Sequence, residues 1–381
     1  MSLNQYYVII IIILLVLWGT VQMICYNRKE KKKLFQIFKS KKALQRLTKR
    51  NKHSKHKKGH ISPDIVPAKY SAQISQSSGQ KTVHFLNAPP QLDLFGHTTE
   101  SVYFFAEVLR TVQNCKFGDT IFFDLSSVEI ISPDAIMYLI AIIKNMRRIK
   151  FLKIICKGNT PKAESARRMI EQSGFFSFVT SVPNRKVVAD GRYMKISDGK
   201  DANGKLASSF CDFVQRACNQ TNLGTKRLYP MIIELMTNTH QHAYDAGEKQ
   251  IMLGNWYIFA QDTEESVRFV FLDTGMGIPQ TVSKRFYEKV KNWIIQDDAM
   301  YIKSALLGEF RSETRQGHRG KGLPGIYEDA RHASIKNLSI ISGKGKCTVD
   351  GNNNNIETET FNQAFEGTLF TWEILKGGIA V

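Results

Sequence analysis

The first apolar stretch of the chain carries no charge. From Tyr6 to Tyr26 no residue is charged, and the run VIIIIILLVLWG is apolar on every side of a helix. The stretch can cross a hydrocarbon core of about 30 Å, so it predicts one transmembrane helix over residues 6–26, after a short extracytoplasmic end at residues 1–5. Positive charges begin only at Arg28, whereas a signal peptide carries them before its apolar run. Because Lys and Arg gather on the cytoplasmic side, we expect a single-pass membrane protein whose C-terminal bulk is cytoplasmic.

Short apolar runs alternate with helical periodicity between residues 82 and 183. The pattern predicts strands at residues 83–86, TIFFDLSS and FLKIICKG, and helices at residues 102–115, PDAIMYLIAIIKNMRRI and ESARRMIEQSGFF. Strands that alternate with helices indicate an α/β layer architecture. Unpatterned polar sequence flanks this part, so we expect residues 27–81 to be a basic juxtamembrane segment and linker, and residues 184–205 a second linker.

Residues 206–381 are expected to form a second α/β domain that carries a polar helix stripe. In ELMTNTHQHA, the polar residues Glu234, Asn238 and His242 follow one another at intervals of four. Residues four apart lie on the same face of an α-helix, so the three side chains form one stripe. A stripe of this kind meets either water or a ligand.

Two glycine-containing segments supply chemistry that suits a nucleotide. VRFVFLDTGMGIP predicts a strand that ends at Asp273, whose carboxylate can accept a hydrogen bond from an exocyclic amine, and Gly275 and Gly277 would let the backbone approach a planar base. RQGHRGKGLPGIYEDA carries further glycines directly before a predicted helix, where backbone N–H groups and the helix dipole favour phosphate. The residues of interest in that second segment are Gly317, Arg319, Gly320, Lys321 and Gly322.

The helix stripe can complete a phosphate site. The amide oxygen of Asn238 is a hard ligand of the kind that Mg²⁺ accepts beside phosphate oxygens and water. Glu234, one turn earlier, could receive a proton from a water or a protein hydroxyl that attacks the γ-phosphate. Thr368, at the start of the terminal strand EGTLFTWEI, adds a hydroxyl.

Taken in this order, the motifs resemble those of the GHKL superfamily of ATP-binding domains, which DNA gyrase, heat-shock chaperones, mismatch-repair proteins, histidine kinases and anti-sigma-factor kinases share. The resemblance covers residues 206–381 and implies a Bergerat α/β sandwich that binds ATP and Mg²⁺. It implies that Glu234 is the general base, Asn238 the Mg²⁺ ligand and Asp273 the adenine-recognising carboxylate. It further implies that Gly275 and Gly277 contact the base, that Gly320 and Gly322 contact phosphate, and that Thr368 lies near the adenine. His242 is compatible with a packing role or a chemical one.

The stretch FFDLSSVEIISPDAIMYLI resembles the STAS domain of anti-sigma-factor antagonists. The resemblance covers about residues 82–183 and implies a STAS-like α/β domain that associates with a GHKL partner. The loop differs from the family pattern, because Ser132, Pro133, Asp134 and Ala135 replace the usual Asp-Ser-Ser-Gly. Asp134 is therefore expected either to mimic the charge of a phosphate or to cap the following helix.

The charge of the chain is concentrated in one segment. Between Arg28 and Lys58 there are fifteen Lys or Arg and one acid, which supply +14 of the formal net charge of +19. Leu and Phe side chains alternate with these lysines, as in a helix on an anionic membrane surface, so anionic lipid is the expected partner and nucleic acid is disfavoured. A solvated linker that only obeys the topology rule is the alternative. The six cysteines show no CxxC pair and suit a reducing compartment.

Two classes of function are open at the level of sequence. None of the nine histidines is followed by Asp or Glu, which argues against histidine autokinase activity. The first class is a signalling enzyme that hydrolyses ATP or phosphorylates a serine or threonine of a partner protein, and Glu234 favours it. The second is an ATP-dependent conformational switch or scaffold with little turnover. A protein partner of unknown identity is expected in both, and a homodimer is compatible with either.

Overall fold

A computed structural model describes residues 73–74, 81–148, 153–175, 191–218, 225–242, 254–285, 297–310, 322–331, 335–350 and 355–376. The chain divides into two compact units, Met1–Pro67 and Ala68–Val381, and all described residues belong to the second. The transmembrane helix predicted at residues 6–26 and the basic segment after it lie outside the described residues. Within the described ranges, no helix combines the length and the apolar character needed to cross a membrane.

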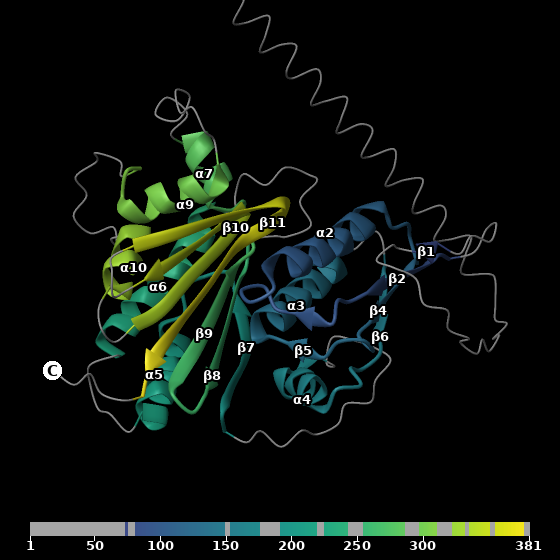
Figure 1. The fold of residues 1–381 in the computed structure, drawn as a ribbon, viewed down its shortest axis with the longest axis horizontal. Coiled ribbons are helices and arrows are strands. Elements are labelled where there is room, and N and C mark those ends of the chain that lie inside the picture. The colour runs from purple at the N-terminus through teal and green to yellow at the C-terminus, as the bar shows by residue number, and fades with distance from the viewer. Residues whose placement is uncertain are drawn as a thin grey trace, which may run out of the picture. The chain divides into compact units, whose positions relative to one another are not determined.

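The described chain has a mixed α/β fold, and its larger sheet is antiparallel throughout (Figure 1). The order of its strands is β10-β11-β9-β8-β7. The strand bounds are β7 Tyr193–Gly199, β8 Trp256–Asp262, β9 Ser266–Asp273, β10 Ile335–Asp350 and β11 Asn355–Leu375. Strand β7 and the first residues of the next helix fall in residues 184–205, which were expected to be a linker. Among the described strands β7 pairs with β8 alone, at the edge of the sheet, and most of its residues are half-buried. Such a strand shows no marked alternation of apolar and polar residues.

Helices cover one face of this sheet and form an apolar core with it. They are α5 Gly204–Cys218, α6 Thr225–His242, α7 Ile278–Arg285, α9 Asp298–Leu307 and α10 Gly322–Ala330. Large side chains from alternate strand positions face these helices, and the rings of Phe269 and Trp372 stack with centroids 5.1 Å apart. This core contains apolar residues of α5, α6 and α10. The apolar face of α6 packs in the core, which fixes the orientation of the helix that carries the polar stripe.

A smaller sheet is built from the region before residue 183. Its strand order is β1-β2-β4-β6, with β2, β4 and β6 parallel and β1 antiparallel to β2. Their bounds are β1 Gln73–Ile74, β2 Val83–Asn87, β4 Thr120–Asp124 and β6 Ile155–Gly158, and a short pair joins β3 Gln91–Leu92 to β5 Ile130–Ile131. The helices are α2 Thr98–Asn114, α3 Pro133–Arg148 and α4 Glu164–Ser173. The α/β alternation predicted for this region is confirmed.

Helices α2 and α3 also pack against the back of the five-stranded sheet. Helix α2 contacts β11, and α3 contacts β8 and β9 (Figure 1). One apolar core joins the inner side chains of the small sheet, both helices, and the strand residues Tyr257, Phe259, Leu272 and Leu369. The side chains of a strand alternate between its two faces, so these four belong to the face opposite the first core. The regions 82–183 and 206–381 therefore share a core across the back of the sheet.

Candidate functional site

Two residues of the polar stripe, Glu234 and Asn238, lie next to the beginning of α10. Glu234 and Asn238 are half-buried, and the Asn238 side-chain amide donates a hydrogen bond to the Glu234 carboxylate. The backbone N–H of Gly322, the first residue of α10, donates to the same carboxylate. Gly322 has φ +59°, so it adopts a backbone conformation that favours glycine. The structure thus brings together three of the residues that the sequence singled out. His242 is the last residue of α6.

The surroundings of Glu234 favour its neutral form. Burial raises the pKa of the Glu234 carboxyl above its usual value, and the hydrogen bonds from Gly322 and Asn238 oppose that rise. A carboxylate whose pKa is raised is a stronger proton acceptor than an ordinary surface carboxylate. The arrangement therefore suits a general base.

Asp273 lies at the end of β9 in a largely enclosed position. Its Oδ1 accepts a hydrogen bond of 2.8 Å from the backbone N–H of Gly275. The Thr239 hydroxyl lies against the same carboxylate and 3.1 Å from the carbonyl oxygen of Leu235, so its single proton serves one acceptor at a time. Asp273 keeps some exposed surface, yet burial raises the pKa of its carboxyl to about 6, against the lowering effect of these two donors. The carboxylate can thus be both ionised at pH 7.5 and poised to receive a further donor.

Two close backbone contacts next to Asp273 require glycine. Gly277 has φ +83°, and a Cβ there would lie 2.8 Å from Ser342 Oγ. Gly367 has φ +101°, and a Cβ there would lie 2.3 Å from the carbonyl oxygen of Asp273. The next residue, Thr368, pairs with Asp273 between β11 and β9, and its Oγ1 lies 3.1 Å from Ser342 Oγ. These contacts place Gly277 and Thr368 at the same strand end as Asp273.

Helix α6 joins the two groups of residues. Asn238 belongs to the group at α10, and the next residue, Thr239, contacts Asp273. Sequence reasoning did not find Thr239, Ser342 or Gly367, although Gly367 directly precedes Thr368 in EGTLF and could have been noticed. Four of the predicted phosphate-binding residues lie outside the described residues: Gly317, Arg319, Gly320 and Lys321.

The loop before α3 differs from both expectations for Asp134. Ser132 caps the helix, because its Oγ accepts from the backbone N–H of Ala135 at 3.4 Å, and Pro133 occupies the first helical position. Asp134 Oδ1 instead accepts from the backbone N–H of Leu94, at 3.0 Å, and from Ser132 Oγ, at 2.5 Å. Burial, with a smaller effect of the nearby Asp93, raises the pKa of Asp134 to about 6. Ser132 and Asp134 are both buried, so the loop serves packing.

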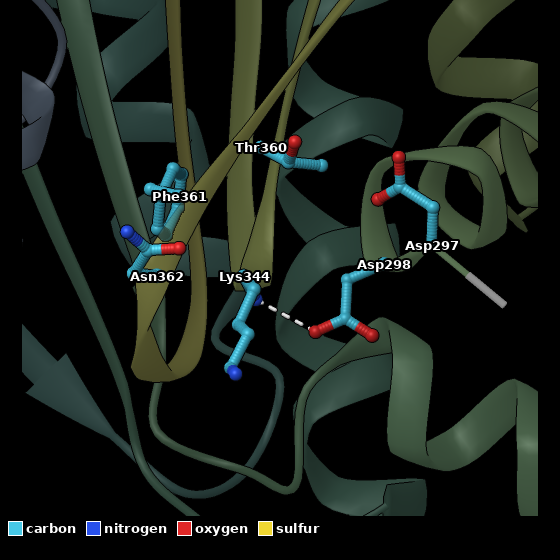
Figure 2. Close-up of a pocket in the computed structure, with 6 residues that line it drawn as sticks. All are labelled: Asp297, Asp298, Lys344, Thr360, Phe361 and Asn362. Atoms are coloured by element: carbon cyan, nitrogen blue, oxygen red, sulfur yellow. Dashed lines mark hydrogen bonds between the residues drawn. The ribbon is translucent and has the colours of Figure 1, made fainter.

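A hollow of about 310 Å³ opens elsewhere on the sheet edge, between the β10–β11 hairpin and the start of α9 (Figure 2). The carboxylates of its two acidic residues both accept hydrogen bonds from backbone N–H groups. Asp297 Oδ1 caps α9 by accepting from Ala299 N at 2.9 Å, and Asp298 Oδ2 accepts from Lys344 N at 2.7 Å. The hollow shares no residue with the stripe of α6, and its polar groups are explained by the local fold.

His84, Cys115 and Asp119 form a small cluster whose ligand atoms lie within 4.8 Å of one another. His84 Nε2 lies 3.3 Å from Asp119 Oδ2, and the Asp119 oxygens also accept from Thr82 N at 3.1 Å and Lys116 N at 2.7 Å. Burial raises the pKa of the Cys115 thiol to about 12, with Asp119 adding to the rise. A protonated thiol and a carboxylate that is already occupied are poor metal ligands, so we interpret the cluster as a structural junction.

Comparison of the chain with protein-family models and with curated proteins finds no match in either set. What the site binds is therefore inferred from its residues. One end offers a buried carboxylate beside glycines, which suits a planar ligand with an amine. The other end offers a carboxylate and an amide at the beginning of a helix, which suits a cation and phosphate.

Proposed function

We propose that this protein is a membrane-anchored, Mg²⁺-dependent ATP-binding protein of the GHKL type. A STAS-like region covers the back of its ATP-binding sheet. In this proposal the protein hydrolyses ATP or transfers the γ-phosphate to a serine or threonine of a partner protein. The observation that supports it most is that α6 contacts both ends of the site, through Glu234 and Asn238 at α10 and through Thr239 at Asp273. Residues 6–26 would anchor the chain, and the basic run after them would bind anionic lipid.

Asp273 is the proposed contact for adenine. Above a pH of about 6 its carboxylate is ionised and can accept a hydrogen bond from the exocyclic amine of the base. A Cβ at Gly275 would lie 3.0 Å from Asp273 Oδ1, so glycine leaves that carboxylate accessible to a flat ring, and Gly277 lets the turn lie close to Ser342. Thr368 supplies a hydroxyl at the same strand end. This group provides recognition of the base and takes no part in phosphate chemistry.

Asn238 fits a magnesium ligand because of how its amide is used. The amide N–H group donates to Glu234, so the amide oxygen keeps its acceptor capacity for a hard cation. When bound, Mg²⁺ neutralises charge on the phosphates. Gly322, at the first turn of α10, brings the positive end of a helix dipole to the same place.

Glu234 favours an enzyme over a simple nucleotide carrier. Binding alone requires the amide, the base-contacting carboxylate and the glycines, whereas a second, half-buried carboxylate beside the cation adds unfavourable desolvation. A carboxylate with a raised pKa can accept the proton of an attacking water or hydroxyl. The chemistry it suits is the same for hydrolysis and for protein phosphorylation.

The second candidate function is a switch with little turnover. The core shared by α2, α3 and the back of the sheet favours it, because a change at the nucleotide site could be transmitted through packed side chains. In that case ATP would alter the surface offered to a partner, and hydrolysis would be incidental.

Full-length protein in detergent, incubated with γ-labelled ATP and Mg²⁺, distinguishes these functions. The variants are Glu234→Ala and, as a matched control, Glu357→Ala, which removes an exposed acid from β11. Free phosphate that requires Glu234 supports an ATPase, and label on protein supports a kinase. ATP binding with neither product supports the switch. Failure of the wild-type protein to bind ATP with Mg²⁺ would refute the proposed function.

A further inference from the structure

Strand β11 contains a bulge directly before the proposed adenine contact. Thr368 pairs with Ser342 and Phe365 pairs with Gly343, so Glu366 and Gly367 have no partners on β10. A bulge of this kind changes the direction of the strand and of the side chains next to it. The geometry of Glu366 and Gly367 therefore decides where Thr368 lies relative to Asp273.

Tyr138 of α3 holds one side of the bulge. Its side chain is fully buried, and its hydroxyl donates a 3.1 Å hydrogen bond to the carbonyl oxygen of Glu366, which is 228 residues away in the sequence. Its ring stacks on that of Phe365, with centroids 4.2 Å apart and an interplanar angle of 26°. The ring of Phe105, from α2, packs edge-on against the same Tyr138 ring, with centroids 4.9 Å apart. The bulge is thus fastened to the helical layer behind the sheet.

Ser342 holds the opposite side of the bulge, toward the site. Its Oγ lies 2.8 Å from the carbonyl oxygen of Gly367 and 3.1 Å from Thr368 Oγ1. The backbone N–H of Ile278, directly after the glycine turn, donates to the same Oγ at 2.9 Å. Tyr138 thus contacts Phe365 and Glu366, and Ser342 contacts the next two residues of β11, Gly367 and Thr368. The helical layer and the site therefore contact adjacent residues of the bulge.

The bulge buries the carboxyl group of Glu366, which is energetically unfavourable. Glu366 Oε2 is buried and has no hydrogen-bond partner within the described residues. Burial raises the pKa of the Glu366 carboxyl, which shows that its surroundings disfavour the charge. The contacts of Tyr138 and Ser342 must offset this cost to keep the bulge where it is.

We propose that Tyr138 is a positioning residue for the nucleotide site. Through the backbone of Glu366, α3 sets the position of Thr368 and of the β9 end that carries Asp273, so the region before residue 183 controls nucleotide affinity. Thr368 and Asp273 are the proposed adenine contacts, so this role rests on the proposed function. Anything that displaces α3 from the sheet would then weaken nucleotide binding.

The test measures the affinity of full-length protein for a fluorescent ATP analogue with Mg²⁺. Tyr138→Phe removes the hydroxyl and keeps the ring, and we expect it to weaken binding roughly 2- to 10-fold, which is the range for one lost hydrogen bond. Phe365→Leu removes the ring stacking and keeps the hydrogen bond, and should act in the same direction. Tyr103→Phe is the matched control, because it removes a hydroxyl from an exposed tyrosine on the neighbouring α2.

A double-mutant cycle distinguishes positioning from general stability. If Tyr138 acts through Thr368, its effect on affinity must shrink in a Thr368→Ala background, whereas a merely structural effect adds to that of Thr368→Ala. Affinity of Tyr138→Phe and Phe365→Leu equal to that of Tyr103→Phe, or full additivity with Thr368→Ala, overturns the positioning role and leaves the proposed function intact. A wild-type protein that does not bind ATP overturns both.

Discussion

Acidification should weaken nucleotide binding through a single carboxyl group. Asp273 is proposed to accept a hydrogen bond from adenine, which requires its ionised form. The pKa of this group is about 6, mainly because of burial, while an exposed Asp titrates near 3.9. Lowering the pH from 7.5 to 5 therefore protonates most Asp273 carboxyls in the nucleotide-free protein, so fewer protein molecules offer adenine an ionised acceptor.

The size of the effect follows from that pKa. At pH 5, one unit below it, roughly one Asp273 carboxyl in ten is ionised, whereas at pH 7.5 nearly all are. We expect the dissociation constant to rise about tenfold over this range, equivalent to about 1.4 kcal/mol. Thr239→Val removes a hydroxyl that lowers the pKa of Asp273, so it should move the midpoint of the change to higher pH.

Equilibrium binding of an ATP analogue to full-length protein at several pH values provides the assay. The phosphates of the ligand also titrate, so the informative quantity is the difference between the wild type and Asp273→Asn, whose amide oxygen still accepts a hydrogen bond but does not ionise. Hydrolysis is unsuitable as a readout, because the raised pKa of Glu234 would add its own pH dependence. Parallel pH profiles for the two proteins would refute the role assigned to Asp273.

Three further outcomes are expected for stability. Asp273→Asn should raise the melting temperature at pH 7.5 and raise it much less at pH 4: the folded-state pKa of about 6 exceeds the usual 3.8, so the stability this group contributes below pH 3.8 is lost as pH rises through 6, by at most about 3 kcal/mol. Gly367→Ala should lower the free energy of unfolding by more than Gly174→Ala, since both residues have positive φ but only Gly367 would also clash, with Asp273; equal losses in chemical denaturation would argue against the close contact. Leu272 is fully buried on β9, in the core that β9 shares with α3. Leu272→Ala should lower the free energy of unfolding by about 2–5 kcal/mol and leave one cooperative unfolding transition by fluorescence and circular dichroism; two separate transitions would argue against a shared core.

Local sequence patterns predicted the elements that carry the site. The interval of four between Glu234 and Asn238 indicated one helix face, and both lie on α6 toward α10. The apolar run before Asp273 indicated a strand that ends there, as β9 does. Such patterns can be recognised in a sequence because they involve residues close together in the chain, whose side chains a helix or strand places at fixed intervals.

Sequence patterns did not predict the contacts between residues that are far apart in the chain. In the sequence, Thr239 is an ordinary helix residue, and its contact with Asp273 of β9 exists only in the folded protein. Ser342 is likewise one serine of a long strand, and its contact with the bulge of β11 depends on the pairing of the two strands. The polar sequence of β7 also gave no strand signal, because an edge strand is only half-buried.

By itself, the sequence determined the α/β alternation, the polar face of α6 and the carboxylate at the end of β9, since each depends on the period of a single element. Only the tertiary structure decided that α2 and α3 cover the back of the larger sheet, and that Tyr138 and Glu366 meet across 228 residues. It also decided that the pKa of Asp273 is about 6, because the burial of a carboxyl group depends on every element packed around it.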